Sequence, residues 1–112
     1  KSQSPRLRAA RAREAGAEYS YQAVYRDATQ RLTSLRAEHG AAERNIVVLD
    51  QKAKALDDAI AALRRSYEAG NGDYAQVLDA EIGKLTLLSQ LAAERANAIA
   101  SAAKFNSELV TP

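Results

Sequence analysis

A heptad pattern between Tyr21 and Tyr67 constrains this 112-residue chain more than any other feature of its sequence. Its members follow one another in steps of alternately four and three residues. We call them the core seam: Tyr21, Tyr25, Ala28, Leu32, Leu35, His39, Ala42, Ile46, Leu49, Ala53, Leu56, Ile60, Leu63 and Tyr67. A period of 3.5 residues keeps a stripe on one side only if the helix supercoils left-handedly around a partner. The pattern predicts a coiled-coil helix of about 50 residues, or roughly 75 Å.

This helical pattern is broken once, at residues 70–73, and then restarts. Gly70 is able to take the left-handed conformation that closes a helix, and the Asn-Gly that follows also tolerates positive φ. The first helix is therefore expected to stop near Ala69. Asp73 is a typical helix N-cap, and Gln76 three positions later completes a capping-box pattern. The sequence thus predicts an all-α fold, a long antiparallel two-helix coiled-coil hairpin.

A basic leader, residues 1–18, precedes the hairpin, and in its first 14 residues five basic side chains stand against Glu14 alone. Ser4 and Pro5 suit the N-cap and the first position of a helix. Such a leader is able to contact phosphate, of nucleic acid or of a lipid headgroup, but we interpret it as a solvated helix end or a segment near a membrane surface. Because no aromatic residues are interleaved to stack bases, we expect no nucleic-acid partner. The expected segments are the leader, first helix, tip and second helix, at residues 1–18, 19–69, 70–73 and 74–110.

Two further lines of residues predict helix contacts. Beside the core seam runs the alanine line of mostly small residues: Ala41, Val48, Ala55, Ala59, Ala62 and Ser66. The second helix carries the Leu/Ile line: Leu78, Ile82, Leu85, Ser89, Ala92, Ala96, Ile99 and Ala103, with Leu88, Leu91, Arg95 and Ala102 beside it. Such breadth is expected of a helix with neighbours on two sides. Folding about Asn71 predicts the Leu/Ile line against the core seam, with Leu56 near Leu85, Ile60 near Ile82 and Ala42 near Ile99.

The first helix is longer than the second, so residues before about Leu32 have no expected partner within the chain. Tyr19, Tyr21 and Tyr25 are then exposed, and we expect self-association through them. With five tyrosines, one phenylalanine and no tryptophan, the composition suits closely packed long helices rather than a thick core. The chain begins with Lys1 rather than Met, so we expect a processed protein or a fragment of a larger assembly.

Catalytic and metal-binding chemistry is not indicated. Cysteine is absent and His39 is the single histidine, which excludes the usual zinc sites. Neighbouring carboxylates such as Asp57 and Asp58 need a pocket before they act as acid and base, so we expect no enzyme, no cofactor and no metal. We interpret His39 as a seam residue. No apolar run approaches the roughly 20 residues of a membrane helix and no signal peptide is visible, so the fragment itself is expected to be soluble.

The residues around the tip resemble a family of transport proteins. Tyr67, Gly70 and then Val77-Leu78-Asp79-Ala80-Glu81 are similar to the Tyr-x-x-Gly…Val-Leu-Asp-Ala-Gln/Glu segment of the outer membrane efflux proteins, the TolC-like channels of Gram-negative tripartite pumps. The resemblance covers residues 19–110 and matches the last periplasmic hairpin of such a channel. It implies a homotrimeric α-barrel that serves as a passive conduit. The implied partners are a periplasmic adaptor protein and, indirectly, an inner-membrane pump.

Carried over to this sequence, the resemblance implies adaptor contacts at Gly70, Asn71, Gly72 and Asp73, flanked by Tyr74, Val77 and Leu78, with Asp79 close to the aperture. The turn differs from the bulkier or basic turns common in the family, and this bears on which adaptor docks. Two other interpretations stay open. One is a self-standing antiparallel coiled coil used as a structural or oligomerisation module. The other is a hairpin of the adaptor itself, whose tip would carry an Arg-Leu-Ser type of signature that this turn lacks.

Overall fold

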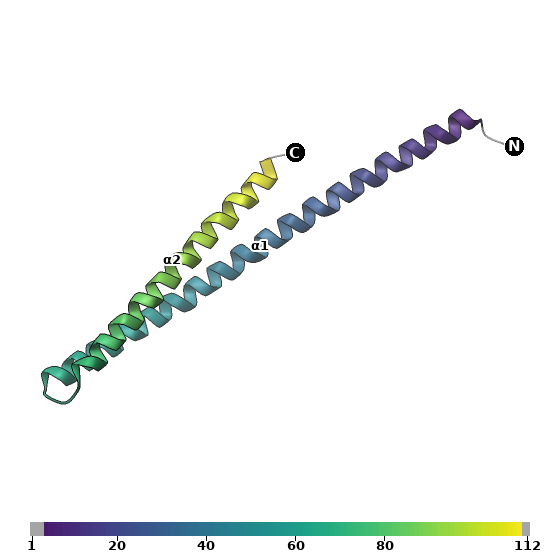
Figure 1. Cartoon of the computed structure of the whole chain (residues 1–112). Coiled ribbons are helices and arrows are strands. Elements are labelled where there is room, and N and C mark those ends of the chain that lie inside the picture. The colour runs from purple at the N-terminus through teal and green to yellow at the C-terminus, as the bar shows by residue number, and fades with distance from the viewer. Residues whose placement is uncertain (1–3, 111–112) are drawn as a thin grey trace.

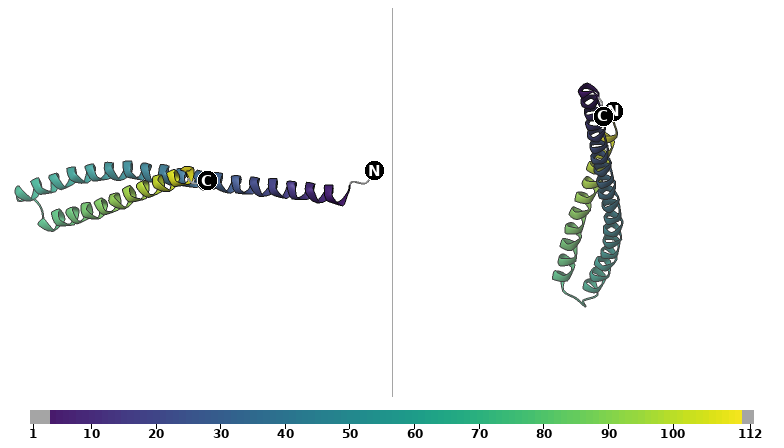
Figure 2. Two further views of the ribbon diagram at one scale, coloured as in Figure 1. Left: turned by 90° about the horizontal axis from the view of Figure 1, so that it is seen from above. Right: turned by 90° about the vertical axis from the view of Figure 1, so that its right-hand side faces the viewer.

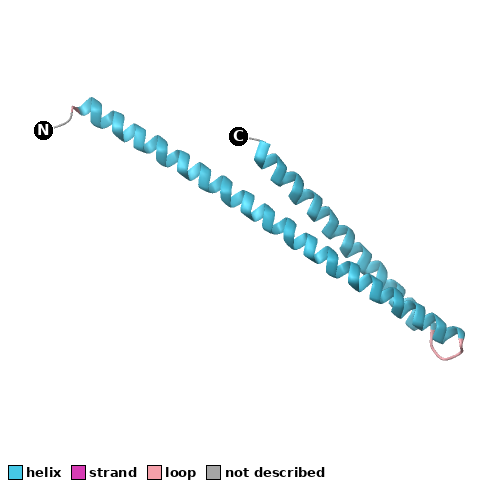
Figure 3. Cartoon of the chain, turned by 180° about the vertical axis from the view of Figure 1, so that it is seen from behind, coloured by secondary structure: helices cyan, strands magenta, loops and turns pink. Residues whose placement is uncertain are grey.

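The computed structural model describes residues 4–110 as two helices joined by one short turn (Figures 1 and 3). Helix α1 runs from Pro5 to Glu68 and α2 from Tyr74 to Val110. The molecule is a rod of 101 × 23 × 16 Å. The predicted all-α helical hairpin is therefore confirmed. Residues 1–3 of the basic leader, and residues 111–112, lie outside the described part of the chain.

The start of α1 follows the local signals in the sequence. Ser4 is the N-cap, because its Oγ accepts a hydrogen bond from the amide of Leu7 at 3.2 Å, and Pro5 takes the first helical position. From there α1 continues without a break, so residues 5–18 of the leader are its first turns. Neither helix of the described chain contains a stretch apolar and long enough to cross a membrane.

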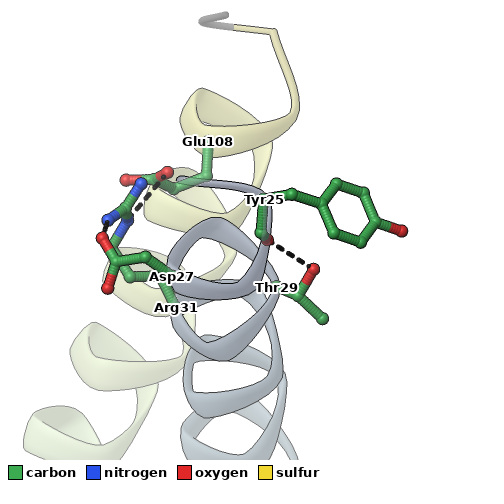
Figure 4. A network of polar contacts seen from close by, with 5 residues as sticks. All are labelled: Tyr25, Asp27, Thr29, Arg31 and Glu108. Carbon is green, nitrogen blue, oxygen red and sulfur yellow. Dashed lines mark hydrogen bonds and ion pairs between the residues drawn. The ribbon is translucent and has the colours of Figure 1, made fainter. Parts of the chain in front are cut away.

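Helix α1 extends well beyond the end of α2 (Figure 1). Every residue from 4 to 27 is exposed, and the core seam becomes half-buried from Ala28 onward. Figure 4 shows this junction, where Arg31 bridges Asp27 on its own helix and Glu108 on α2. The ring of Tyr25 points away from α2 and is 65% exposed. The overhang predicted from the sequence is present, and it ends slightly earlier than Leu32.

The core seam is the face that α1 turns toward α2. From Ala28 to Leu63 each of its members is buried or half-buried, and Ala42 and Ile60 are the most buried. The ribbons overlap near the tip in Figure 1 but toward the end of α2 in the left view of Figure 2, so the two helices wind about each other. This is the geometry expected from a 3.5-residue repeat.

Helix α2 contacts α1 through a line of which only Leu91 and Ala102, beside the Leu/Ile line, were predicted as helix contacts. We call it the inner line: Val77, Ala80, Glu81, Lys84, Leu87, Leu91, Glu94, Ala98, Ser101, Ala102, Phe105 and Glu108. The Leu/Ile line lies outside, and Ile82, Leu85 and Ile99 are 60%, 67% and 72% exposed. The Leu56 methyl Cδ2 instead approaches to 3.9 Å of the point where a Cβ on Gly83 would lie. The prediction that the Leu/Ile line packs on the core seam is therefore wrong.

Polar contacts across the two helices accompany this orientation of α2. They are the ion pairs Arg64–Glu81, Asp57–Lys84, Asp50–Arg95 and Arg31–Glu108, the Asn45–Glu94 hydrogen bond of 2.9 Å and the contact of the His39 ring with the carbonyl of Ala98. Long charged side chains cover apolar surface with their stems and keep their charged ends in water, so a line that looks polar in sequence is able to face α1. A hairpin of two helices has only one partner for α2 and leaves the other apolar line open.

Candidate functional site

The tip is a turn closed by hydrogen bonds at the end of α1. Gly70 has a φ of +82°, the one positive φ among the described residues. Its amide donates to the carbonyl of Tyr67 at 2.9 Å, and the amide of Asn71 donates to the carbonyl of Ser66 at 2.9 Å. Together these bonds form a Schellman helix ending. The left-handed closure predicted at Gly70 is confirmed, whereas neither Asn71 nor Gly72 has a positive φ.

The start of α2 is capped by Asp73. Its Oδ1 accepts a hydrogen bond from the amide of Ala75 at 3.0 Å, which satisfies one of the orphan amides of the first turn. The capping box predicted with Gln76 does not form, because among the described residues that side chain makes no hydrogen bond back to the cap. The hydroxyl of Ser66 donates to the carbonyl of Asn71 and ties the turn to α1.

An aromatic pair flanks the turn. The rings of Tyr67, from α1, and Tyr74, from α2, have centroids 5.1 Å apart and planes tilted by 51°. Both side chains stay about half exposed. Tilted pairs at this distance are favourable beyond their buried area, by about 0.5–1.5 kcal/mol. Tyr67 was predicted as a member of the core seam, and its pairing with Tyr74 was not predicted. The signal in the sequence is one tyrosine on each side of the Gly70 turn.

The structure separates the predicted contact residues into two groups. Seven of them are exposed: Gly70, Asn71, Gly72, Asp73, Tyr74, Leu78 and Asp79. Val77 is different, since it is 1% exposed and is the largest fully buried side chain. It packs beneath the tip on the inner line and offers no surface to a partner. Its role is to hold α2 against α1 where the chain reverses.

His39 links the helices in the half of the hairpin away from the tip. Its Nδ1 lies 2.9 Å from the carbonyl oxygen of Ala98 and 3.3 Å from the hydroxyl of Ser101, and its Nε2 lies 2.9 Å from Glu43. Because a carbonyl oxygen only accepts, the Nδ1–H donates across the helix boundary. His39 therefore has a structural partner on α2, as its seam position suggested.

Several open grooves run along the boundary between the two helices. The groove nearest the tip is lined by Asp57, Ile60, Ala61, Arg64, Glu81, Lys84, Leu85 and Leu88. Its carboxylates Asp57 and Glu81 are each paired with a cation. Farther along, hydrogen bonds from Asn45 and Asn97 lower the pKa of Glu94. Within residues 4–110 no group of three or more His, Cys, Asp or Glu side chains is placed to hold a metal ion.

Comparison of the sequence with protein-family models, with curated proteins and with solved structures found no match. The tip and the exposed Leu/Ile line are therefore interpreted from their own geometry. The tip presents polar groups and two half-exposed tyrosines at the end of the rod. The Leu/Ile line presents apolar side chains along the flank, where a helix lying along α2 is able to cover them.

Proposed function

We propose that this chain is a periplasmic hairpin of a TolC-like outer membrane efflux channel, and that its tip docks a periplasmic adaptor protein. The observation that carries the proposal is the tip itself. Three residues of the Tyr-x-x-Gly…Val-Leu pattern have distinct roles there: Gly70 closes α1 in the left-handed conformation, Tyr67 stands against Tyr74, and Val77 packs α2 onto α1. The resembling family implies the adaptor as partner.

The mechanism expected of such a hairpin is passive. The hydrogen-bonded turn holds Asn71 and Asp73 at the end of the rod, so an adaptor meets a preformed surface and little chain entropy is lost on docking. The loop at residues 70–72 joins two helices and lacks the lysine and the preceding strand of a phosphate-binding loop. The resemblance implies that the free energy that moves a substrate through the conduit comes from the inner-membrane pump.

A second candidate function is a self-standing coiled-coil module. One observation favours it, since α1 and α2 already bury the core seam and the inner line within a single chain. Such a module has no need of an exposed tip pattern. This interpretation predicts that substitutions at the tip leave partner binding unchanged, whereas substitutions along the flank of the helices weaken it.

The test is site-specific photo-crosslinking in cells that produce the polypeptide containing these residues. A photoreactive residue at Asn71 is expected to capture the adaptor, and the same residue at Gln51, exposed in the middle of α1, serves as the control. Asp73→Arg and Gly70→Pro are expected to impair export while the channel still assembles. Equal capture at both positions, or normal export in both variants, would overturn the docking role of the tip.

A further inference from the structure

Asn71 differs from the other three asparagines of the chain because it lies outside a helix. It stands in the turn between α1 and α2 (Figure 3), and its side chain is exposed. Among the described residues only its backbone takes part in hydrogen bonds, whereas the side chains of Asn45 and Asn97 both bond Glu94. The following residue, Gly72, has no Cβ to crowd the Asn71 carboxamide. The Cγ carbon of Asn71 is therefore open to attack.

The backbone nitrogen of Gly72 is the group placed to attack that carbon. Because it is bonded to the carbonyl carbon of Asn71, its bond to Cγ closes a five-membered ring within the chain. Among the described residues its N–H donates no backbone hydrogen bond. At Asn106, which is also exposed and also precedes a small residue, the next amide is held by the hydrogen bonding of α2. The turn thus frees a nucleophile that a helix holds in place.

A hydroxyl group of α1 acts on the same peptide group. The Oγ–H of Ser66 donates to the carbonyl oxygen of Asn71, and the amide of Asn71 donates to the carbonyl of Ser66 at 2.9 Å. When the Gly72 nitrogen loses its proton, amide resonance moves negative charge onto that carbonyl oxygen of Asn71. A hydroxyl bonds an anionic oxygen more strongly than a neutral one. Ser66 therefore favours the deprotonated peptide, which is the attacking form.

From these features we propose that Asn71 is a site of spontaneous deamidation assisted by Ser66. The Gly72 nitrogen gives its proton to hydroxide and bonds to Cγ of Asn71, while the Cγ–Nδ2 bond breaks and the leaving nitrogen takes up a proton from water as ammonia. Water then opens the cyclic imide at either of its carbonyls. Opening at Cγ gives aspartate, and opening at the backbone carbonyl gives isoaspartate. The whole reaction consumes one water, releases one ammonia and involves no oxidation or reduction.

Both products change the tip. Each replaces a neutral carboxamide by a carboxylate close to Asp73, the cap of α2. Isoaspartate also adds one methylene group to the backbone between Gly70 and Asp73, and the oxygen that accepts from Ser66 becomes part of a free carboxylate. The tip thus changes charge as the molecule ages. The chemistry is independent of what binds the tip, whereas an effect of the new charge on an adaptor rests on the proposed function.

The test is incubation of the full chain in warm, mildly alkaline buffer, followed over time by tryptic digestion and mass spectrometry. Trypsin places Asn71 and Asn106 in separate peptides. Conversion at Asn71 is expected to be many-fold faster than at Asn106, and to accelerate as pH rises because the Gly72 amide has to lose a proton. Gly72→Ala is expected to slow it several-fold and leave the fold unchanged. The φ at this position is not positive, and a Cβ there would meet Ser66 Oγ at 3.4 Å, an ordinary contact.

Ser66→Ala tests the hydroxyl. In the folded chain it is expected to slow conversion at Asn71 several-fold, and this difference is expected to vanish in guanidinium chloride, where the turn is lost. In the denaturant, conversion at Asn106 is expected to rise because α2 no longer protects it. Equal conversion at Asn71 and Asn106 in the folded chain, or an unchanged rate in Gly72→Ala, would refute the site. A folded Ser66→Ala chain that converts as fast as the wild type, or faster, would refute the role of the hydroxyl. Neither result bears on adaptor capture.

Discussion

Two leucines on α2 give a stringent test of which line faces α1. Leu91 on the inner line is 3% exposed, whereas Leu85 on the Leu/Ile line is 67% exposed. Both lie inside α2, away from its ends. Leu→Ala at either site therefore changes helix propensity equally. The difference between the two variants reports packing alone.

The expected cost follows from the exposed fractions. Leu91→Ala removes a side chain that is almost fully buried and leaves a partly filled space, so we expect a loss of about 2–3 kcal/mol in the free energy of unfolding. Leu85→Ala removes a side chain of which only a third is covered, so we expect about 0.5–1 kcal/mol. The melting temperature is expected to fall by about 10 °C for Leu91→Ala and by a few degrees for Leu85→Ala.

The assay is urea and thermal unfolding followed by circular dichroism. It is run at a protein concentration low enough that the wild-type midpoint no longer depends on concentration, because any self-association would add stability that does not come from packing within the hairpin. If Leu85→Ala lowered the free energy of unfolding as much as Leu91→Ala, or more, the inner line could not be the face that packs on α1. That result would support packing of the Leu/Ile line on the core seam, as expected from the sequence.

Three further changes test the account. Gly70→Ala is expected to destabilise the hairpin by about 1–2 kcal/mol in urea unfolding, because a Cβ meets no atom there and only the positive φ is strained; Gly40→Ala inside α1 is the control and should not destabilise. Glu94→Gln is expected to make the free energy of unfolding depend less on pH in the acid range. Because hydrogen bonds from Asn45 and Asn97 lower the pKa of Glu94 in the folded state, the ionised Glu94 stabilises the fold above its ordinary pKa, and this stabilisation is lost as pH falls through the lowered pKa. The same pH dependence in the wild type and the variant would count against the hydrogen bonds from Asn45 and Asn97. Leu56→Asp buries a charge in the core seam and is expected to unfold the hairpin at a cost of several kcal/mol; unchanged helicity and melting would show that the core seam is misplaced.

The sequence predicted α1, the turn, and which residues of α1 and α2 lie at the same distance from the tip. Local chemistry determines the helix and the turn, and the turn then sets how the two helices align. The core seam repeats without error from Ala28 to Leu63, and all of it lies toward α2. Gly70 closes the helix because a left-handed residue is needed there and glycine takes that conformation at no steric cost. Ser4 caps α1 for an equally local reason. Such features need no knowledge of the partner helix.

The most apolar line of α2 is not the line that faces α1, so choosing that line gave the wrong packing face. Glu81, Lys84 and Glu94 are charged, so their positions do not stand out as a packed line, but each has a polar partner across the boundary, at Arg64, Asp57 and Asn45 respectively. That signal was present in the sequence, because opposite charges stand at matching levels once the chain is folded about the tip.

The tip was predicted in outline and refined by the structure. Tyr74 and Leu78 are exposed as a contact surface requires, while Val77 is buried because the inner line begins with it. The capping box failed since the Asp73 carboxylate bonds the amide of Ala75, one position before the expected one. Both differences depend on the orientation in which α2 starts relative to α1, which the contacts between the two helices determine and the local sequence does not.

The channel role is tested most directly by locating the native polypeptide that contains these residues. Source cells are fractionated, the polypeptide is detected with an antibody against this hairpin, and its assembled size is measured in detergent. The account predicts a trimer in the outer membrane, each subunit much larger than 12.1 kDa. A species of about this mass in the fraction without membranes would contradict the channel and favour the self-standing coiled-coil module.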